Sequence, residues 1–124
     1  MGFDFNLTIE TFIDSETGLP FVWSITDVKK IPYNPEEWRL PERFRQFAIM
    51  RGHHLGAYTR DLPLPDLSYR ADVHTVLAYF PKWVEVAEDM DWAGCDWDAE
   101  KHFLFKECLE WCASKPGYWC TWSY

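Results

Sequence analysis

Two adjacent histidines, His53 and His54, come closest in this sequence to an acid–base site. An imidazole can act as a general base near neutral pH, and a guanidinium group can stabilise a developing negative charge. Arginines flank the pair on both sides. The candidate binding residues are Arg43, Arg51, His53, His54, Tyr58 and Arg60. Because guanidinium suits carboxylate and phosphate groups, this segment predicts an anionic ligand or an acidic partner surface.

The arginines are segregated along the chain. All six lie within residues 39–70, and all six lysines lie outside that range. Three acids in the same range leave it with a net charge of +3, whereas the whole chain carries −8. Two interpretations stay open. The arginines either face a partner, or they pair internally with the acidic flanks and hold their segment against the rest of the domain.

The cysteines are the other group with chemical potential. Cys108 and Cys112 lie one helical turn apart, which is too far for a disulfide within a regular helix. They share an apolar arc with Leu104, Phe105 and Leu109, while His102 falls on the polar arc of the same helix. This arrangement favours buried thiols over zinc ligands.

Other recognisable chemistry is missing from the sequence. The histidines lack the spacing of common zinc sites, and the acidic run at residues 88–98 lacks the ligand spacing of a calcium loop. No phosphate loop, dinucleotide fingerprint or hydrolase elbow is present. We therefore expect no metal, no cofactor and no catalytic residues, which favours a protein that is not an enzyme.

Strands are predicted at both ends of the chain. Residues 3–10 alternate apolar and polar side chains without error, and residues 21–26 follow after a turn, so residues 3–26 predict a β-hairpin. Phe12 and Ile13 mark a bulge or a strand end, and Ile31–Pro35 is an irregular connection. The tail at residues 118–124 predicts a third strand that returns to the sheet.

Helices are predicted between these strands. Asn34 and Pro35 suit a helix start, and Pro41 interrupts or restarts that helix. Residues 42–51 predict a helix with Phe44, Phe47 and Ala48 facing inward. Residues 72–80 show helical spacing that continues to Ala87 despite Pro81, and a last helix runs from Asp96 or Trp97 to Ala113.

Together these elements predict one globular α+β domain covering residues 1–124. Its small antiparallel sheet, made of the N-terminal β-hairpin and the C-terminal strand, packs against three or four helices. Aromatic residues make up 19% of the chain and include eight tryptophans. Trp23, Trp83 and Trp111 lie on the apolar faces of their elements, so we expect them in the core; the other five are undetermined.

The charge and the apolar content of the chain argue against several classes of function. The net charge of −8 argues against nucleic-acid binding, because affinity for phosphate backbones is mainly electrostatic. No apolar run approaches the length of a membrane span, and the first residues do not resemble a signal peptide, so we expect a cytoplasmic protein without a membrane partner. We interpret it as a non-enzymatic protein-interaction or regulatory module, whose sheet edge could also pair with a second copy to form a homodimer.

One alternative of a different class remains open. The chain could be a small enzyme or a ligand-binding protein for an anionic metabolite or a nucleotide, with the arginine and histidine segment at residues 39–70 as its pocket. That hypothesis requires the arginines to converge with His53 and His54 on one concave site.

Overall fold

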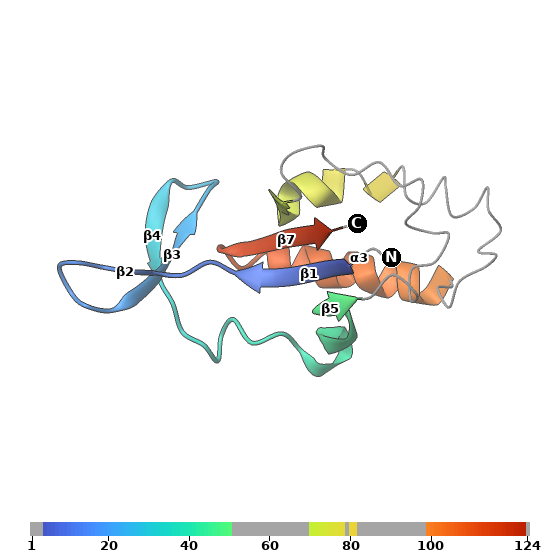
Figure 1. The fold of residues 1–124 in the computed structure, drawn as a ribbon, viewed down its shortest axis with the longest axis horizontal. Coiled ribbons are helices and arrows are strands. Elements are labelled where there is room, and N and C mark those ends of the chain that lie inside the picture. Colours follow the sequence, from blue (N-terminus) through green and yellow to red (C-terminus); the bar gives the residue numbers. More distant parts are fainter. Residues whose placement is uncertain (1–3, 51–69, 79, 82–98, 124) are drawn as a thin grey trace.

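The computed structural model describes residues 4–50, 70–78, 80–81 and 99–123. These residues form a mixed α+β structure, as the sequence predicts, but with two antiparallel sheets rather than the expected one. Figure 1 shows α3 (Ala99–Ala113) running along one face of the larger sheet, with the smaller sheet at the end of the larger one.

The larger sheet has the strand order β5–β1–β7–β6. Its strands are β1 (Asp4–Ile9), β5 (Ile49–Met50), β6 (Arg70–Asp72) and β7 (Tyr118–Ser123). The alternating N-terminal segment is confirmed as β1, with Phe5 buried, and the aromatic tail is confirmed as β7. The register places Phe5 opposite Trp122 and Leu7 opposite Cys120. The two sequence ends therefore form the centre of this sheet.

The smaller sheet consists of β2 (Phe12–Ile13), β3 (Pro20–Ser24) and β4 (Lys29–Pro32). Here the hairpin prediction for residues 3–26 is wrong, because β3 pairs with β2 and β4 and not with β1. Strand β1 already has β5 on one side and β7 on the other, which leaves no edge for β3. The connection predicted as irregular at Ile31–Pro35 begins inside β4.

The helix predicted at residues 42–51 is also corrected. The structure has a short 3-10 helix, η1 (Glu42–Phe47), followed directly by β5. Phe44 and Phe47 are buried as expected. The backbone then turns to pair with β1, and the Leu7 N–H donates a 2.9 Å hydrogen bond to the Ala48 carbonyl. This pairing with β1 ends the helical conformation before Gly52.

The two later helices are confirmed where the structure describes them. Residues 73–78 are helical, and Asp72 caps them by accepting hydrogen bonds from the backbone N–H of Thr75, at 3.1 Å, and from its hydroxyl, at 2.6 Å. Helix α3 ends at Ala113, the predicted end. The predicted stripe from Trp83 to Ala87 lies outside the described residues.

Phe105 of α3 lies at the centre of the core. Its ring centroid is 5.6 Å from Phe5, 5.2 Å from Phe47 and 6.1 Å from Phe80, all of which are buried. The core thus joins the sheet, η1 and the second helical segment to α3. No helix that the structure describes has the length and apolar character needed to cross a bilayer.

Two predictions of burial, for His102 and Trp23, are wrong. His102, predicted on the polar arc of α3, is fully buried against Phe80, with ring centroids 4.4 Å apart. Trp23, predicted in the core, is 41% exposed. Trp38 and Trp122, which the sequence left undetermined, are buried instead, while Trp111 packs partly buried at the edge of the core.

Candidate functional site

Most of the site predicted from sequence lies outside the described residues. This holds for Arg51, His53, His54, Tyr58 and Arg60. Arg43 is described: it is exposed on η1, and its guanidinium lies 4.3 Å from the centroid of the Phe44 ring. Whether these residues converge therefore remains a prediction.

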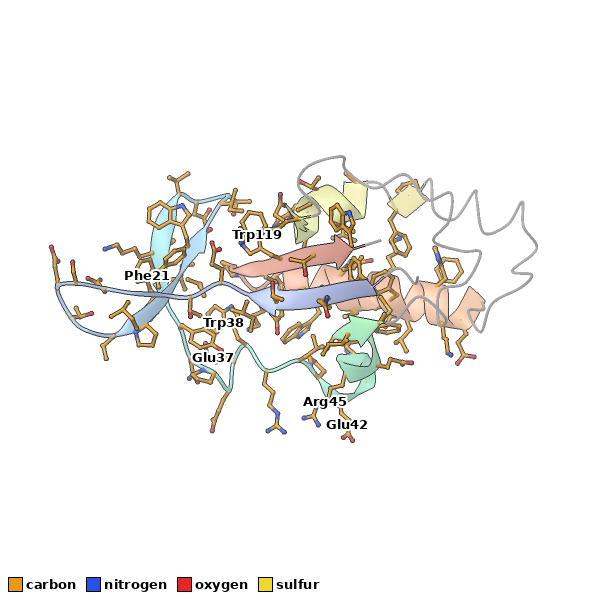
Figure 2. All side chains as sticks on the ribbon, in the orientation of Figure 1. Phe21, Glu37, Trp38, Glu42, Arg45 and Trp119 are labelled. Atoms are coloured by element: carbon orange, nitrogen blue, oxygen red, sulfur yellow. The ribbon has the colours of Figure 1, made fainter. Side chains whose placement is uncertain are left out.

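The described arginines divide between the two interpretations. Arg70 forms an ion pair with Glu10, as internal pairing requires. Arg39, Arg43 and Arg45 are exposed, and among the residues that the structure describes no carboxylate lies within ion-pair distance of them. Figure 2 shows Arg45 pointing away from the sheets at η1. Within the described residues, internal pairing thus accounts for Arg70 but not for these three.

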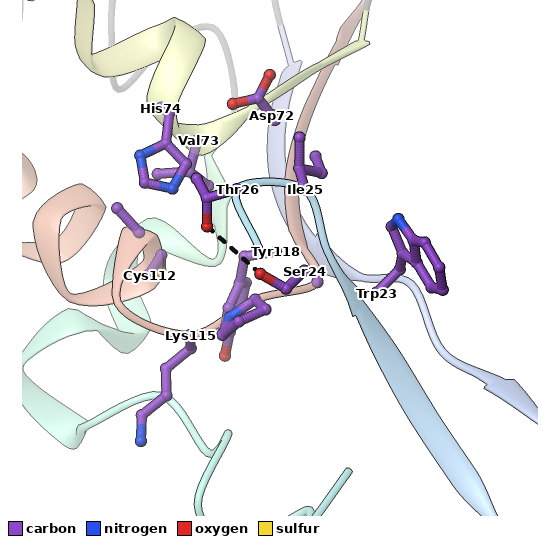
Figure 3. Close-up of a pocket in the computed structure, with 13 residues that line it drawn as sticks. Trp23, Ser24, Ile25, Thr26, Asp72, Val73, His74, Cys112, Lys115 and Tyr118 are labelled. Atoms are coloured by element: carbon purple, nitrogen blue, oxygen red, sulfur yellow. Dashed lines mark hydrogen bonds between the residues drawn. The ribbon is translucent and has the colours of Figure 1, made fainter. Parts of the chain in front are cut away.

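Strand β3 turns Trp23 toward solvent, whereas the sequence predicts this side chain in the core. Alternation places Phe21 and Trp23 on one face of the strand, yet the opposite face is the buried one, with Val22 and Ser24 inside, and Ile25 follows directly in the turn. Figure 3 shows Trp23 on the side of β3 opposite to Ser24. Trp23 and Ile25 are 41% and 51% exposed. A strand that buries a serine and exposes a tryptophan breaks the usual pattern, and such violations concentrate at functional sites.

These exposed side chains line a groove between the two sheets, with a volume of about 190 Å³. We call it the aromatic groove. Its residues are Glu10, Phe12, Phe21, Trp23, Ile25, Gly117 and Trp119. The rings of Phe12 and Phe21 stack with centroids 5.6 Å apart across the β2–β3 pair. Figure 2 shows Phe21 on the smaller sheet and Trp119 on β7, the two elements that the groove separates.

The charges around the aromatic groove are paired. Arg70 binds Glu10, and its guanidinium lies 3.9 Å from the centroid of Trp119. Lys30 lies 3.7 Å from the Asp14 carboxylate and 5.0 Å from the centroid of Phe21. A hydrogen bond from the Glu16 N–H, aided by Lys30, lowers the pKa of Asp14. Each of these two cations therefore neutralises one acid and contacts one aromatic ring.

The indole N–H groups distinguish the groove from the core. Buried Trp38 donates its indole N–H to the Pro116 carbonyl at 2.7 Å. Trp23 and Trp119 have no acceptor for theirs within the part of the chain that the structure describes. Two tryptophans that line the aromatic groove thus keep an indole N–H without an acceptor among the described residues, and the one carboxylate of the groove, Glu10, is engaged by Arg70.

A second, smaller cavity of about 40 Å³ lies behind β3 and holds a hydroxyl, an imidazole and a carboxylate (Figure 3). These groups are not linked as a catalytic triad. Ser24 Oγ lies 3.3 Å from Thr26 Oγ1, Asp72 is engaged by Thr75, and no hydrogen bond joins His74 to Ser24 or Asp72. The volume suits a few water molecules, not a metabolite.

The described cysteines are unsuited to nucleophilic or metal chemistry. Cys108, Cys112 and Cys120 are free, buried thiols, which confirms the burial predicted for the first two. A hydrogen bond with Cys108 and burial raise the pKa of Cys112, and burial raises the pKa of Cys120, so both stay protonated. Among residues 4–50, 70–78, 80–81 and 99–123, no three His, Cys, Asp or Glu side chains are grouped to hold a metal ion.

Comparison with protein-family models, curated proteins and solved structures finds no match for this chain. Sequence reasoning missed the aromatic groove because it assigned Trp23 to the core by strand phase. A usable signal was present: the strand at residues 21–26 offers a buried face with only one large apolar residue, Val22.

Proposed function

We propose that this protein is a non-enzymatic interaction module that binds a partner protein through the aromatic groove. The observation that carries the proposal is the inverted strand β3, which exposes Trp23 and buries Ser24 and is followed directly by the exposed Ile25. Exposing large apolar side chains costs free energy in the isolated protein, and burial by a partner recovers it.

The distribution of exposed apolar side chains supports the same surface. Eight large apolar residues are exposed among those the structure describes, and six of them lie within residues 12–28. They are Phe12, Ile13, Leu19, Trp23, Ile25 and Val28. Single exposed apolar residues are ordinary, but Phe12, Trp23 and Ile25 of this set gather in the aromatic groove, and such a group indicates an interaction site. Tryptophan is also the residue most enriched at interface hot spots.

Position-specific photo-crosslinking tests the proposal. A p-benzoylphenylalanine in place of Ile25 faces the aromatic groove, and the same group in place of Phe103 of α3 provides a control at an equally exposed position, since both side chains are 51% exposed. Irradiation in a lysate of the source cells should give a discrete crosslinked protein from position 25 only. Trp23→Ala should abolish that product, and Phe103→Ala should not. Equal products from both positions, or none, would contradict the proposal.

The second surface considered for partner binding is the arginine segment at residues 39–70. Arg39, Arg43 and Arg45 are exposed without carboxylate partners among the described residues, which supports a role in contacting an acidic surface. The anionic-ligand hypothesis, with His53 and His54, is tested by a thermal-shift screen of phosphates, nucleotides and carboxylates. A cytoplasmic location is supported by the three buried free thiols.

A further inference from the structure

We propose that the occupant of the aromatic groove is a proline-rich segment of the partner in the polyproline II conformation. This inference rests on the proposed function, because it names the chemistry of the partner at the same surface. Aromatic-lined grooves are the usual receptors for this conformation, which is preformed and therefore loses little entropy on binding.

Hydrogen-bond complementarity supports this occupant. Trp23 and Trp119 line the aromatic groove and their indole N–H groups have no acceptor among the described residues, while its one side-chain carboxylate, Glu10, is engaged by Arg70. A suitable ligand therefore brings acceptors and few donors. Consecutive prolines meet this condition, since each has a carbonyl oxygen and no N–H. An ordinary extended peptide brings an N–H with every residue and would leave some of them without acceptors.

Charge complementarity supports it as well. Both cations that contact rings of the aromatic groove, Arg70 and Lys30, are paired with a carboxylate, so neither is left as an unpaired positive charge. An uncharged segment fits such a surface, and neither a polyanion nor a polycation gains from it. The chain's net charge of −8 further disfavours a nucleic acid, although its bases could stack on the rings.

The size of the aromatic groove points to a chain that crosses it. Its volume of about 190 Å³ is below the range of about 300–1,000 Å³ in which proteins enclose small ligands. Pyrrolidine rings are compact and apolar, and a polyproline II helix presents a ring on each of its three sides. One side of such a helix can place its rings between Trp23 and Trp119 while the remainder stays in solvent.

Titration with decaproline tests the inference on the full chain. Proton–nitrogen NMR spectra resolve the indole N–H groups, assigned with Trp→Phe variants. We expect decaproline to shift the Trp23 and Trp119 signals and leave the Trp38 signal, whose N–H is bonded to Pro116, unchanged. Trp23→Ala should weaken binding about tenfold or more, as expected for a hot-spot residue. Trp23→Phe keeps a ring but loses the hydrogen-bond donor, so its affinity for decaproline should lie between those of the unmodified protein and Trp23→Ala. Phe103→Ala should bind as the unmodified protein does.

The outcomes separate this inference from the proposed function. No binding of decaproline, together with a specific crosslink from position 25, overturns the proline-rich occupant and leaves the interaction module standing. Failure of both experiments overturns both. A linear oligosaccharide such as cellohexaose, run in parallel, identifies a sugar-binding surface if it shifts the same two indole signals and decaproline does not; that result also overturns the inference.

Discussion

The hydroxyl of Tyr118 donates a 2.6 Å hydrogen bond to the backbone carbonyl of Trp38, 80 positions earlier in the chain. A second hydrogen bond joins the same two segments, because the indole of Trp38 donates to the carbonyl of Pro116 at 2.7 Å. Both residues are buried. These two bonds attach the segment before η1 to the start of β7, and they hold β7 where its next residue, Trp119, lines the aromatic groove.

Removing the Tyr118 hydroxyl should therefore destabilise the protein. Tyr118→Phe keeps the ring but leaves the buried Trp38 carbonyl without its donor, at a cost of about 1–3 kcal/mol in the free energy of unfolding. Urea denaturation measures the change. The control is Tyr33→Phe, since Tyr33 is partly buried and its ring contacts the same tryptophan, with centroids 5.6 Å apart. Equal losses from the two variants would contradict a specific role for the Tyr118 hydrogen bond.

Gly117 sets the separation between the two sheets. Its φ is +101°, and a Cβ at this position would lie 2.8 Å from Val22 Cγ1. Gly117→Ala should lower the free energy of unfolding by about 3 kcal/mol, through backbone strain and steric overlap together. Gly18→Ala is the matched control, because its φ is +72° but nothing lies within 4 Å of the new Cβ. It should lose about 1–2 kcal/mol from strain alone. A control that loses as much as Gly117→Ala would show that Val22 imposes no steric limit.

The sequence predicts those elements whose apolar pattern matches the face that becomes buried. Strand β1 is the clearest case, since Phe5 is buried and Leu7 and Ile9 pack against the core. Helix α3 is confirmed to its last residue, and Phe105, Cys108, Leu109 and Cys112 of its predicted apolar arc are buried, although His102 of the polar arc is buried as well. Sequence patterning does not identify pairing partners, however. The contact of Ile49 and Met50 with β1 converts the end of a predicted helix into β5.

The candidate site could not be predicted because it depends on long-range contacts. Val22 is buried because Gly117, far along the chain, permits a close approach of the turn before β7 to β3. That approach fixes which face of β3 is inside and leaves Trp23 exposed. His102 is buried for a similar reason, since Phe80 from another segment covers it. Neither the burial of Val22 nor that of His102 can be predicted from local periodicity in the sequence. Of the predicted binding residues, only Arg43 belongs to the described part of the chain.

The turn between β3 and β4 contains a strained residue. Val28 has a φ of +52°, a conformation that a β-branched side chain adopts at a cost, and it is exposed. Val28→Asn should raise the free energy of unfolding by about 1 kcal/mol, because asparagine tolerates this conformation. Val28→Thr, which remains β-branched, should give no such gain. Thermal or urea denaturation measures both variants, and an equal effect of the two would show that backbone strain is not the cause.

His102 should make the stability of the protein depend on pH below neutrality. Burial lowers its pKa from 6.5 to about 4, with a further contribution from the positive charge of Lys106. The folded protein therefore resists a proton that the unfolded chain accepts. Stability from this residue is complete above pH 6.5, falls as the pH decreases, and by pH 4 about 3 kcal/mol is lost.

Denaturation of the unmodified protein and of His102→Gln, measured between pH 7 and pH 4, isolates this contribution. Glutamine does not titrate in this range, so the variant should lose less stability than the unmodified protein over the same interval, although it starts lower because a buried amide replaces the imidazole. His74→Gln serves as the control, since His74 is exposed, and it should retain the full pH dependence. Parallel curves for the unmodified protein and His102→Gln would mean that other groups, such as the carboxylates, cause the acid sensitivity.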